Sequence, residues 1–199
     1  MAVFFLARIL GALYFINNID DKDLVARSRR SLIGNSVLFL VFFLSFVIRT
    51  LLADGYAVNP ETGEIFMEPY KYLTNFIEMP VVLVLFLIGV VLVLFGIGKS
   101  LLKPKFDKGI WFTGIGTVLA VLALLLVAGY NHTAYYPSTS DLQSSLTLAN
   151  SCSSEFTLRV MFYVSFLVPF VLAYIFYAWR SIDIHKIDEK EMKDGGHSY

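Results

Sequence analysis

The amino-acid sequence contains five apolar stretches separated by short polar segments. They cover residues 2–16, 32–53, 79–102, 110–130 and 158–179. A helix needs about 20 consecutive apolar residues to cross a bilayer core of roughly 30 Å. Four of the stretches reach that length, and the first is shorter. We therefore expect an all-α fold, a polytopic transmembrane helical bundle with four full spans and a short N-terminal span.

The composition supports a membrane protein and excludes several other classes. The chain is 57% hydrophobic and 16% charged, whereas a soluble domain carries about 25% charged residues. Its formal net charge of zero provides no basic face for a phosphate backbone, so we expect no nucleic-acid partner. Cys152 is the only cysteine, which rules out an internal disulfide and a CxxC motif. The expected surroundings of the spans are membrane lipid.

Basic residues gather in alternate loops. Several Lys and Arg residues lie in segments 17–31 and 98–109 and in the tail after Trp179, whereas segment 54–78 has only Lys71 and segment 131–156 has none. Positive residues favour the cytoplasmic side. This pattern predicts the N-terminus outside and the C-terminus inside. We expect one bundle over residues 1–183 and a polar cytoplasmic tail over 184–199.

The first apolar stretch is too short for an ordinary span. At a rise of about 1.5 Å per residue, it falls several ångströms short of a bilayer core of roughly 30 Å. Either it is tilted under a thinned bilayer or the chain is the later part of a longer protein, and we favour the second interpretation. Arg8 lies in the middle of this stretch. We expect it to face protein, either a lost part of the subunit or a partner subunit.

Other charged residues lie near the ends of the spans. Arg49 and Glu78 lie at the same outer level, and we predict an ion pair that fixes the second and third spans; a proton or ligand site is the alternative. Arg159 lies in the first outer turn of the last span, where it can snorkel, meet the same carboxylate or contact a partner. Pro169 removes the helical donor for the Ser165 carbonyl and predicts a kink.

Turn and cap signals organise the loops. Residues 59–63 read as a turn between extended arms at 56–58 and 64–67. Residues 70–77 form either an interfacial helix or a simple connector. Helix starts are indicated by Pro80, Asp107, and Ser153 or Ser154. Small residues that allow close helix approach are Gly96, Gly98, Gly114 and Gly116.

Ligands for a haem are scarce in the apolar stretches. The three histidines are His132, His185 and His197, and none lies within a span. Haem iron takes His, Met, Cys or Tyr as axial ligand, and Met161, the best-placed methionine, has no histidine nearby. We therefore predict that this chain alone binds no haem and supplies no catalytic, cofactor-binding or metal-binding residues.

Several separated motifs resemble subunit II of cytochrome bd quinol oxidases. They are YFINNID at 14–20, AVNPETGE at 57–64, MEPYKY at 67–72, LTLANSCSSEFTL at 146–158 and VPFVLAY at 168–174. Cys152 stands where the family usually has a small residue. The resemblance covers nearly the whole chain but only the later half of the family's subunit, so the chain resembles a split or truncated product.

The resemblance implies a haem-free subunit in the bacterial cytoplasmic (inner) membrane. The partner, subunit I, would bind the b-type and d-type haems, oxidise quinol and reduce dioxygen to water in an aerobic or microaerobic respiratory chain. A split product would also need a separate chain that supplies the N-terminal bundle. The family's acidic residues for proton uptake lie mainly in the half that is not covered, so none is carried over. A small independent transporter or channel, and an inactive truncated remnant, are the alternatives.

Overall fold

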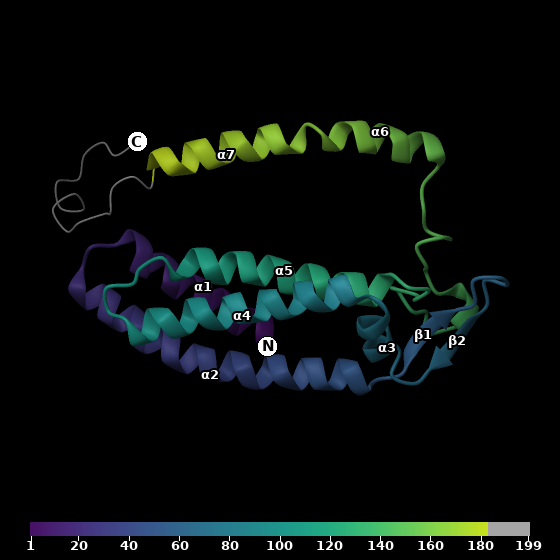
Figure 1. The fold of residues 1–199 in the computed structure, drawn as a ribbon, viewed down its shortest axis with the longest axis horizontal. Coiled ribbons are helices and arrows are strands. Elements are labelled where there is room, and N and C mark those ends of the chain that lie inside the picture. Colours follow the sequence, from purple (N-terminus) through teal and green to yellow (C-terminus); the bar gives the residue numbers. More distant parts are fainter. Residues whose placement is uncertain (183–199) are drawn as a thin grey trace.

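The computed structural model describes residues 1–182, and the expected polar tail at 184–199, with His185 and His197, lies outside the described residues. Figure 1 shows long helices running side by side, with a small hairpin at one end. The elements are α1 (Ala2–Asn18), α2 (Lys22–Leu52), β1 (Gly55–Val58), β2 (Ile65–Glu68), α3 (Lys71–Glu78), α4 (Pro80–Leu102), α5 (Gly109–Gly129), η1 (Leu142–Ser144), α6 (Glu155–Ser165) and α7 (Val168–Ile182). Within residues 1–182, four helical segments are long and apolar enough to cross a membrane, and α1 is a shorter apolar helix. The predicted polytopic helical bundle is thus confirmed.

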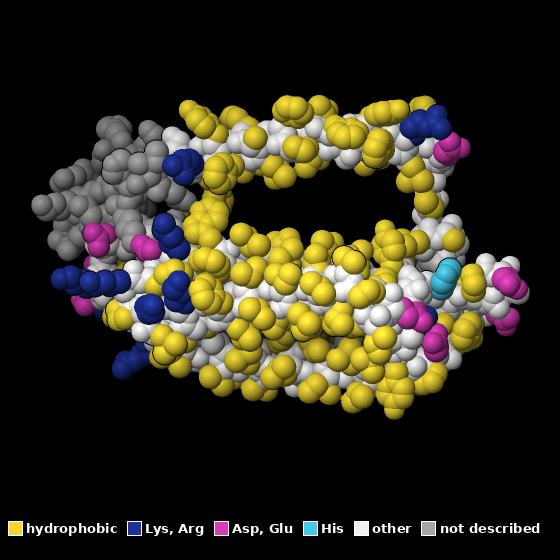
Figure 2. Space-filling view, viewed as in Figure 1, with side chains coloured by type: hydrophobic (Ala, Val, Ile, Leu, Met, Phe, Trp, Pro, Cys, Tyr) yellow, Lys and Arg dark blue, Asp and Glu magenta, His cyan; other side chains and the backbone are white. Residues whose placement is uncertain are grey.

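Helices α1, α2, α4 and α5 form the packed part of the bundle. One hydrophobic cluster joins α1 to α2 and α4, with Ile9, Leu13 and Leu32 completely buried. A second cluster, built around Phe76 and Ala123, joins α3, α4 and α5 nearer the hairpin. Many apolar residues of the helices, such as Val37, Val91 and Val118, are exposed on the molecular surface (Figure 2). That distribution suits helices whose outer faces contact lipid rather than water.

Glycines bring α4 and α5 into close antiparallel contact. A Cβ added at Gly89 would lie 2.6 Å from the Ala120 nitrogen, and one added at Gly116 would lie 2.6 Å from the Gly89 carbonyl oxygen. Gly96 lies equally close to the partner helix, whereas a Cβ at Gly98 or Gly114 would meet nothing within 4 Å. Small residues let helix backbones approach in a membrane, so one glycine of each predicted pair serves the interface.

A side chain of α2 caps the end of α4. The Arg29 guanidinium donates hydrogen bonds to the carbonyl oxygens of Ser100, Lys103, Pro104 and Phe106, the Pro104 bond being 2.7 Å long. The last carbonyls of a helix lack helical donors and carry partial negative charge. The capping therefore joins the basic end of α2 to the α4–α5 turn.

The outer loop folds as the turn signals predict. Strands β1 and β2 pair antiparallel, with Tyr56 opposite Met67. Asn59 Oδ1 accepts from the Glu61 amide at 2.9 Å, and Gly63 takes a φ of +72°. The Gln143 side chain then bonds both the amide and the carbonyl of Ile65, at 2.9 and 2.8 Å. The second outer loop is thereby attached to the hairpin.

Residues 70–77, which could be a helix or a connector, form helix α3, from Lys71 to Glu78. Pro80 lies in the first turn of α4, and the Ser154 side chain caps α6 by accepting from the Thr157 amide. The prediction of Asp107 as the cap of α5 is wrong. Because α5 begins only at Gly109, Lys108 occupies the N-cap position, without a side-chain cap bond.

The last span is interrupted and stands away from the bundle. Helix α6 ends at Ser165 and α7 begins at Val168; between them the Leu167 amide bonds the Val164 carbonyl at 2.9 Å, three residues back. Pro169 is the second residue of α7. All residues from 155 to 181 are exposed except the partly exposed Ala178, and Figure 2 shows an open space between this span and the bundle.

Candidate functional site

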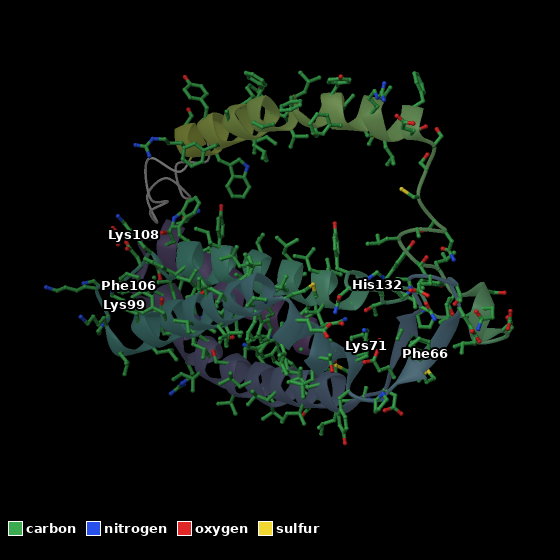
Figure 3. The ribbon with its side chains drawn as sticks, turned by 45° about the vertical axis from the view of Figure 1, so that its right-hand side comes forward. Phe66, Lys71, Lys99, Phe106, Lys108 and His132 are labelled. Atoms are coloured by element: carbon green, nitrogen blue, oxygen red, sulfur yellow. The ribbon has the colours of Figure 1, made fainter. Side chains whose placement is uncertain are left out.

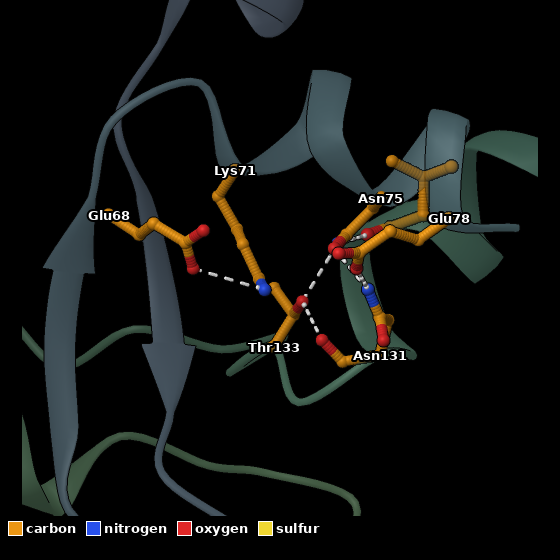
Figure 4. Close-up of polar contacts among 7 residues, drawn as sticks. Glu68, Lys71, Asn75, Glu78, Asn131 and Thr133 are labelled. Atoms are coloured by element: carbon orange, nitrogen blue, oxygen red, sulfur yellow. Dashed lines mark hydrogen bonds and ion pairs between the residues drawn. The ribbon is translucent and has the colours of Figure 1, made fainter.

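A polar cluster lies at the hairpin end of the bundle (Figure 4). Its centre is Asn75, which is fully buried. The side-chain amide nitrogen of Asn75 donates to the Val127 carbonyl at 2.9 Å and to the Thr133 hydroxyl at 2.8 Å. The side-chain oxygen of Asn75 accepts from the side-chain amide nitrogen of Asn131 at 3.0 Å. Asn131 also donates to a Glu78 carboxylate oxygen. We call Asn75, Glu78, Asn131 and Thr133 the outer polar cluster.

Helix α3 and the turn after α5 position these side chains. Asn75 and Glu78 lie one helical turn apart, on the same face of α3. Asn131 and His132 have φ values of 56° and 53°, a left-handed conformation that asparagine tolerates better than most residues. The turn directs Asn131 toward α3, while His132 is exposed and uses its backbone carbonyl to accept from the Val58 amide at 2.8 Å (Figure 3).

A buried lysine lies beside the outer polar cluster. Lys71 is 6% exposed, and its ammonium group pairs with the Glu68 carboxylate at 3.1 Å. A Cβ added at Gly55 would lie 2.5 Å from the Lys71 Cβ, so only a glycine there leaves room for the lysine stem. Removing one partner of such a pair leaves an uncompensated charge, which is strongly destabilising. The pair therefore holds α3 against the hairpin.

Tyr72, the next residue of α3, has a perturbed acidity. Burial raises the pKa of its phenol above the ordinary 10.0, and the nearby Tyr56 raises the pKa further. Burial disfavours the charged phenolate. Tyr72 therefore stays protonated and neutral at physiological pH.

Within residues 1–182, the predicted pair of Arg49 and Glu78 is not among the ion pairs of the structure. Ion pairs within residues 1–182 join Lys71 to Glu68 and Arg159 to Glu155, the latter at 2.6 Å. Glu78 bonds Asn131 instead of Arg49. The physical reason is that α3 separates α2 from α4 in the chain and turns Glu78 toward the loop after α5. Arg159 meets the carboxylate one turn before it in α6, so it does not meet Glu78 either.

Arg8, the remaining predicted contact residue, lies on an exposed face of α1. Its guanidinium carbon lies 5.7 Å from the centre of the Phe4 ring. Within the described part of the chain, it forms no ion pair. The structure thus leaves this charge on the outside of the bundle.

An apolar pocket of about 380 Å³ opens between α1, α2, α4 and α5. Phe43, Val90 and Leu124 are among its lining residues, and the hydroxyl of Thr117, which also lines it, is bonded to the Thr113 carbonyl at 2.7 Å. Such a surface suits apolar molecules rather than ions.

The chemistry of the outer polar cluster is structural. Its amide and hydroxyl groups bond one another or the backbone, and within residues 1–182 no three His, Cys, Asp or Glu side chains gather as a metal site requires. Sequence reasoning missed Asn75, Asn131 and Thr133 as partners. The spacing of Lys71, Asn75 and Glu78 on one face of a short helix was the available signal.

The chain is similar to proteins of known type. The family described as "Cytochrome bd terminal oxidase subunit II" matches residues 1–182. Subunit 2 of the cytochrome bd-I ubiquinol oxidase from Escherichia coli strain K12 is 28% identical over 156 residues, which is 77% of this chain and 39% of that protein. The same subunit from Escherichia coli O157:H7 has the same identity and coverage. The chain thus spans about two fifths of the length of these curated relatives.

Proposed function

Because the chain belongs to the cytochrome bd terminal oxidase subunit II family, we propose that it is a haem-free membrane subunit of a quinol oxidase. In this proposal a partner, subunit I, carries the b-type and d-type haems, oxidises quinol and reduces dioxygen to water. The complex lies in a bacterial inner membrane and serves a respiratory chain. The family match along residues 1–182 is the observation that carries the proposal.

The packing of the described residues favours a supporting role over a catalytic one. The two hydrophobic clusters and the α4–α5 glycine contacts form a rigid apolar wall. The polar side chains at the hairpin end are bonded to each other and hold the outer loops in place. Such a wall is suited to pack against a haem-bearing subunit and to exclude water from its flank, while apolar dioxygen can still approach.

A small independent transporter is the second candidate, because the last span is broken at Phe166 and Leu167. Broken helices form substrate sites when they line a polar cavity near the bilayer midplane. Here the break is surrounded by exposed apolar side chains, and short-range backbone bonds satisfy it. The oxidase proposal is therefore preferred.

The test is a pull-down of the tagged chain from its native membrane in mild detergent, followed by an optical spectrum. We expect a larger haem-bearing subunit to co-purify, with b-type and d-type absorbance bands. An unrelated membrane protein with the same tag is the control for proteins that co-purify only because they share detergent micelles. A colourless eluate without that subunit would contradict the proposal and favour a transporter or an inactive remnant.

A further inference from the structure

Arg8 lies well inside the apolar part of the bundle. Helix α1 runs beside α2, since Phe5 stacks on Phe42 with ring centres 5.6 Å apart and Ile9 shares a core cluster with Phe39. The run of basic residues at the start of α2 ends with Arg30. Phe39 comes nine positions after Arg30 in the helix, a rise of roughly 13 Å. Arg8, next to Ile9, therefore lies about that far from the basic residues at the start of α2.

The side chain of Arg8 points deeper into the apolar region. Its guanidinium lies over the ring of Phe4, one turn nearer the start of α1. Side chains of a helix lean toward its N-terminus, and here that direction leads away from the basic end. A lysine or arginine that reaches headgroups by snorkelling would point the other way. The ring offers a cation–π contact but no counter-charge, and a charge at membrane depth normally faces protein or water.

The same face of α1 is open and notched. Ile9, Leu13 and Ile16 on the opposite side are 0 to 2% exposed and pack on the bundle. On the open side, Ala7 and Gly11 stand four residues apart, and a Cβ at Gly11 would meet nothing within 4 Å. Two small residues at this spacing let another transmembrane helix approach closely.

We propose that this open face of α1 binds a transmembrane helix of a second polypeptide that carries an Asp or Glu at the depth of Arg8. The unpaired charge requires an opposite charge in a low-dielectric setting, and the Ala7–Gly11 notch gives a partner helix the room to bring one there. A phospholipid surface supplies its negative charge at headgroup level, far from this depth. The proposal does not require the partner to be the haem-bearing subunit.

The first experiment identifies the neighbour in the assembled complex in native membranes. The change Phe4→benzoylphenylalanine, an aromatic photocrosslinker, places a probe beside Arg8. We expect a crosslink to a second polypeptide, mapped by peptide mass spectrometry to an apolar segment with a carboxylate within about one helical turn of the site. Crosslinks only to phospholipid or to this chain itself would overturn the proposal, as would a segment without a carboxylate.

The second experiment tests the charge. Arg8→Glu should lower the crosslink yield roughly tenfold or more, and exchanging the mapped carboxylate for arginine should restore it. Arg8→Lys, which keeps the charge, should retain most of the yield. A yield that stays within about twofold for Arg8→Glu, or no restoration by the exchanged pair, would refute the ion pair.

The third experiment tests the notch. Gly11→Leu should reduce the yield strongly, whereas Gly34→Leu, at a position equally free of neighbours within 4 Å, should leave it unchanged. The two variants should unfold at the same temperature in detergent, because a Cβ at either position meets no other atom of the chain within 4 Å. An equal loss of crosslinking in both variants would remove the notch from the proposal.

Discussion

The sharpest prediction concerns Gly89 in the contact between α4 and α5. In Gly89→Ala the new Cβ would lie 2.6 Å from the Ala120 nitrogen and 2.8 Å from the Gly116 oxygen, both backbone atoms. Ordinary contact begins at 3.4 Å, so the two helices must move apart by roughly 0.8 Å, a gap that forfeits a quarter to a half of the dispersion energy at nearby contacts. Overpacking of this kind costs about 1–3 kcal/mol.

Gly98→Ala is the matched control on the same helix. Its Cβ meets nothing within 4 Å, so the substitution brings only the higher helix propensity of alanine, about 0.5–1 kcal/mol. That gain is common to both variants and cancels in the comparison. Gly89→Ala should therefore be less stable than Gly98→Ala by about 1–3 kcal/mol.

The measurement is the free energy of unfolding in mixed micelles, from a titration with dodecyl sulfate followed by circular dichroism. Gly116→Ala, on the facing helix, should behave as Gly89→Ala does, because its Cβ would lie 2.6 Å from the Gly89 oxygen. Equal stability of Gly89→Ala and Gly98→Ala would refute the reasoning, since it would mean that the two backbones are not in contact at Gly89.

Three further predictions concern polar groups. Arg29→Met should lower the free energy of unfolding by about 1–2 kcal/mol, because the carbonyls at the end of α4 lose a charged donor. Arg27→Met, which removes an exposed arginine from the same helix, should change the free energy of unfolding by less than about 0.5 kcal/mol. Equal effects of the two substitutions would argue against the Arg29 cap. Asn75→Leu should cost about 2–4 kcal/mol in the same titration, because it removes the donor to the Val127 carbonyl and the Thr133 hydroxyl and the acceptor for the Asn131 side chain. A neutral result would mean that water replaces the Asn75 side-chain amide. Tyr72 should ionise above the ordinary pKa of 10.0 in an absorbance titration. Because its pKa is higher in the folded protein than in the unfolded chain, its contribution to stability is complete below the unfolded pKa and is lost as the pH rises through the folded pKa. Ionisation at pH 10.0 or below would contradict its burial.

Local signals were sufficient for much of the fold. The length of the apolar stretches predicted the spans, and the turn at 59–63 predicted the β1–β2 hairpin. Pro80 and Ser154 marked helix starts correctly. Each of these features depends on residues close together in the chain, so a short window of sequence contains the cause. Asp107 is not the cap because α5 begins at Gly109, which places Lys108 at the N-cap position.

The candidate site depended on contacts that no local window contains. Asn75 meets Val127 and Thr133 across more than 50 residues, and Arg29 meets the end of α4 across more than 70. Such pairs depend on how far each helix is rotated about its axis and on which loop folds over it. Arg49 and Glu78 were therefore predicted to form an ion pair because they lie at the same outer level, whereas in the structure Glu78 bonds Asn131.

The sequence by itself determined that this chain is a membrane protein, how many long spans it has and where its hairpin lies, because hydropathy and turn chemistry act over a few residues. Only the tertiary structure decided which glycines serve the α4–α5 contact, which groups pair with Asn75 and Glu78, and that Arg8 remains outside the bundle. Those outcomes follow from helix rotation and close packing, in which displacements of about an ångström change the partner of a side chain.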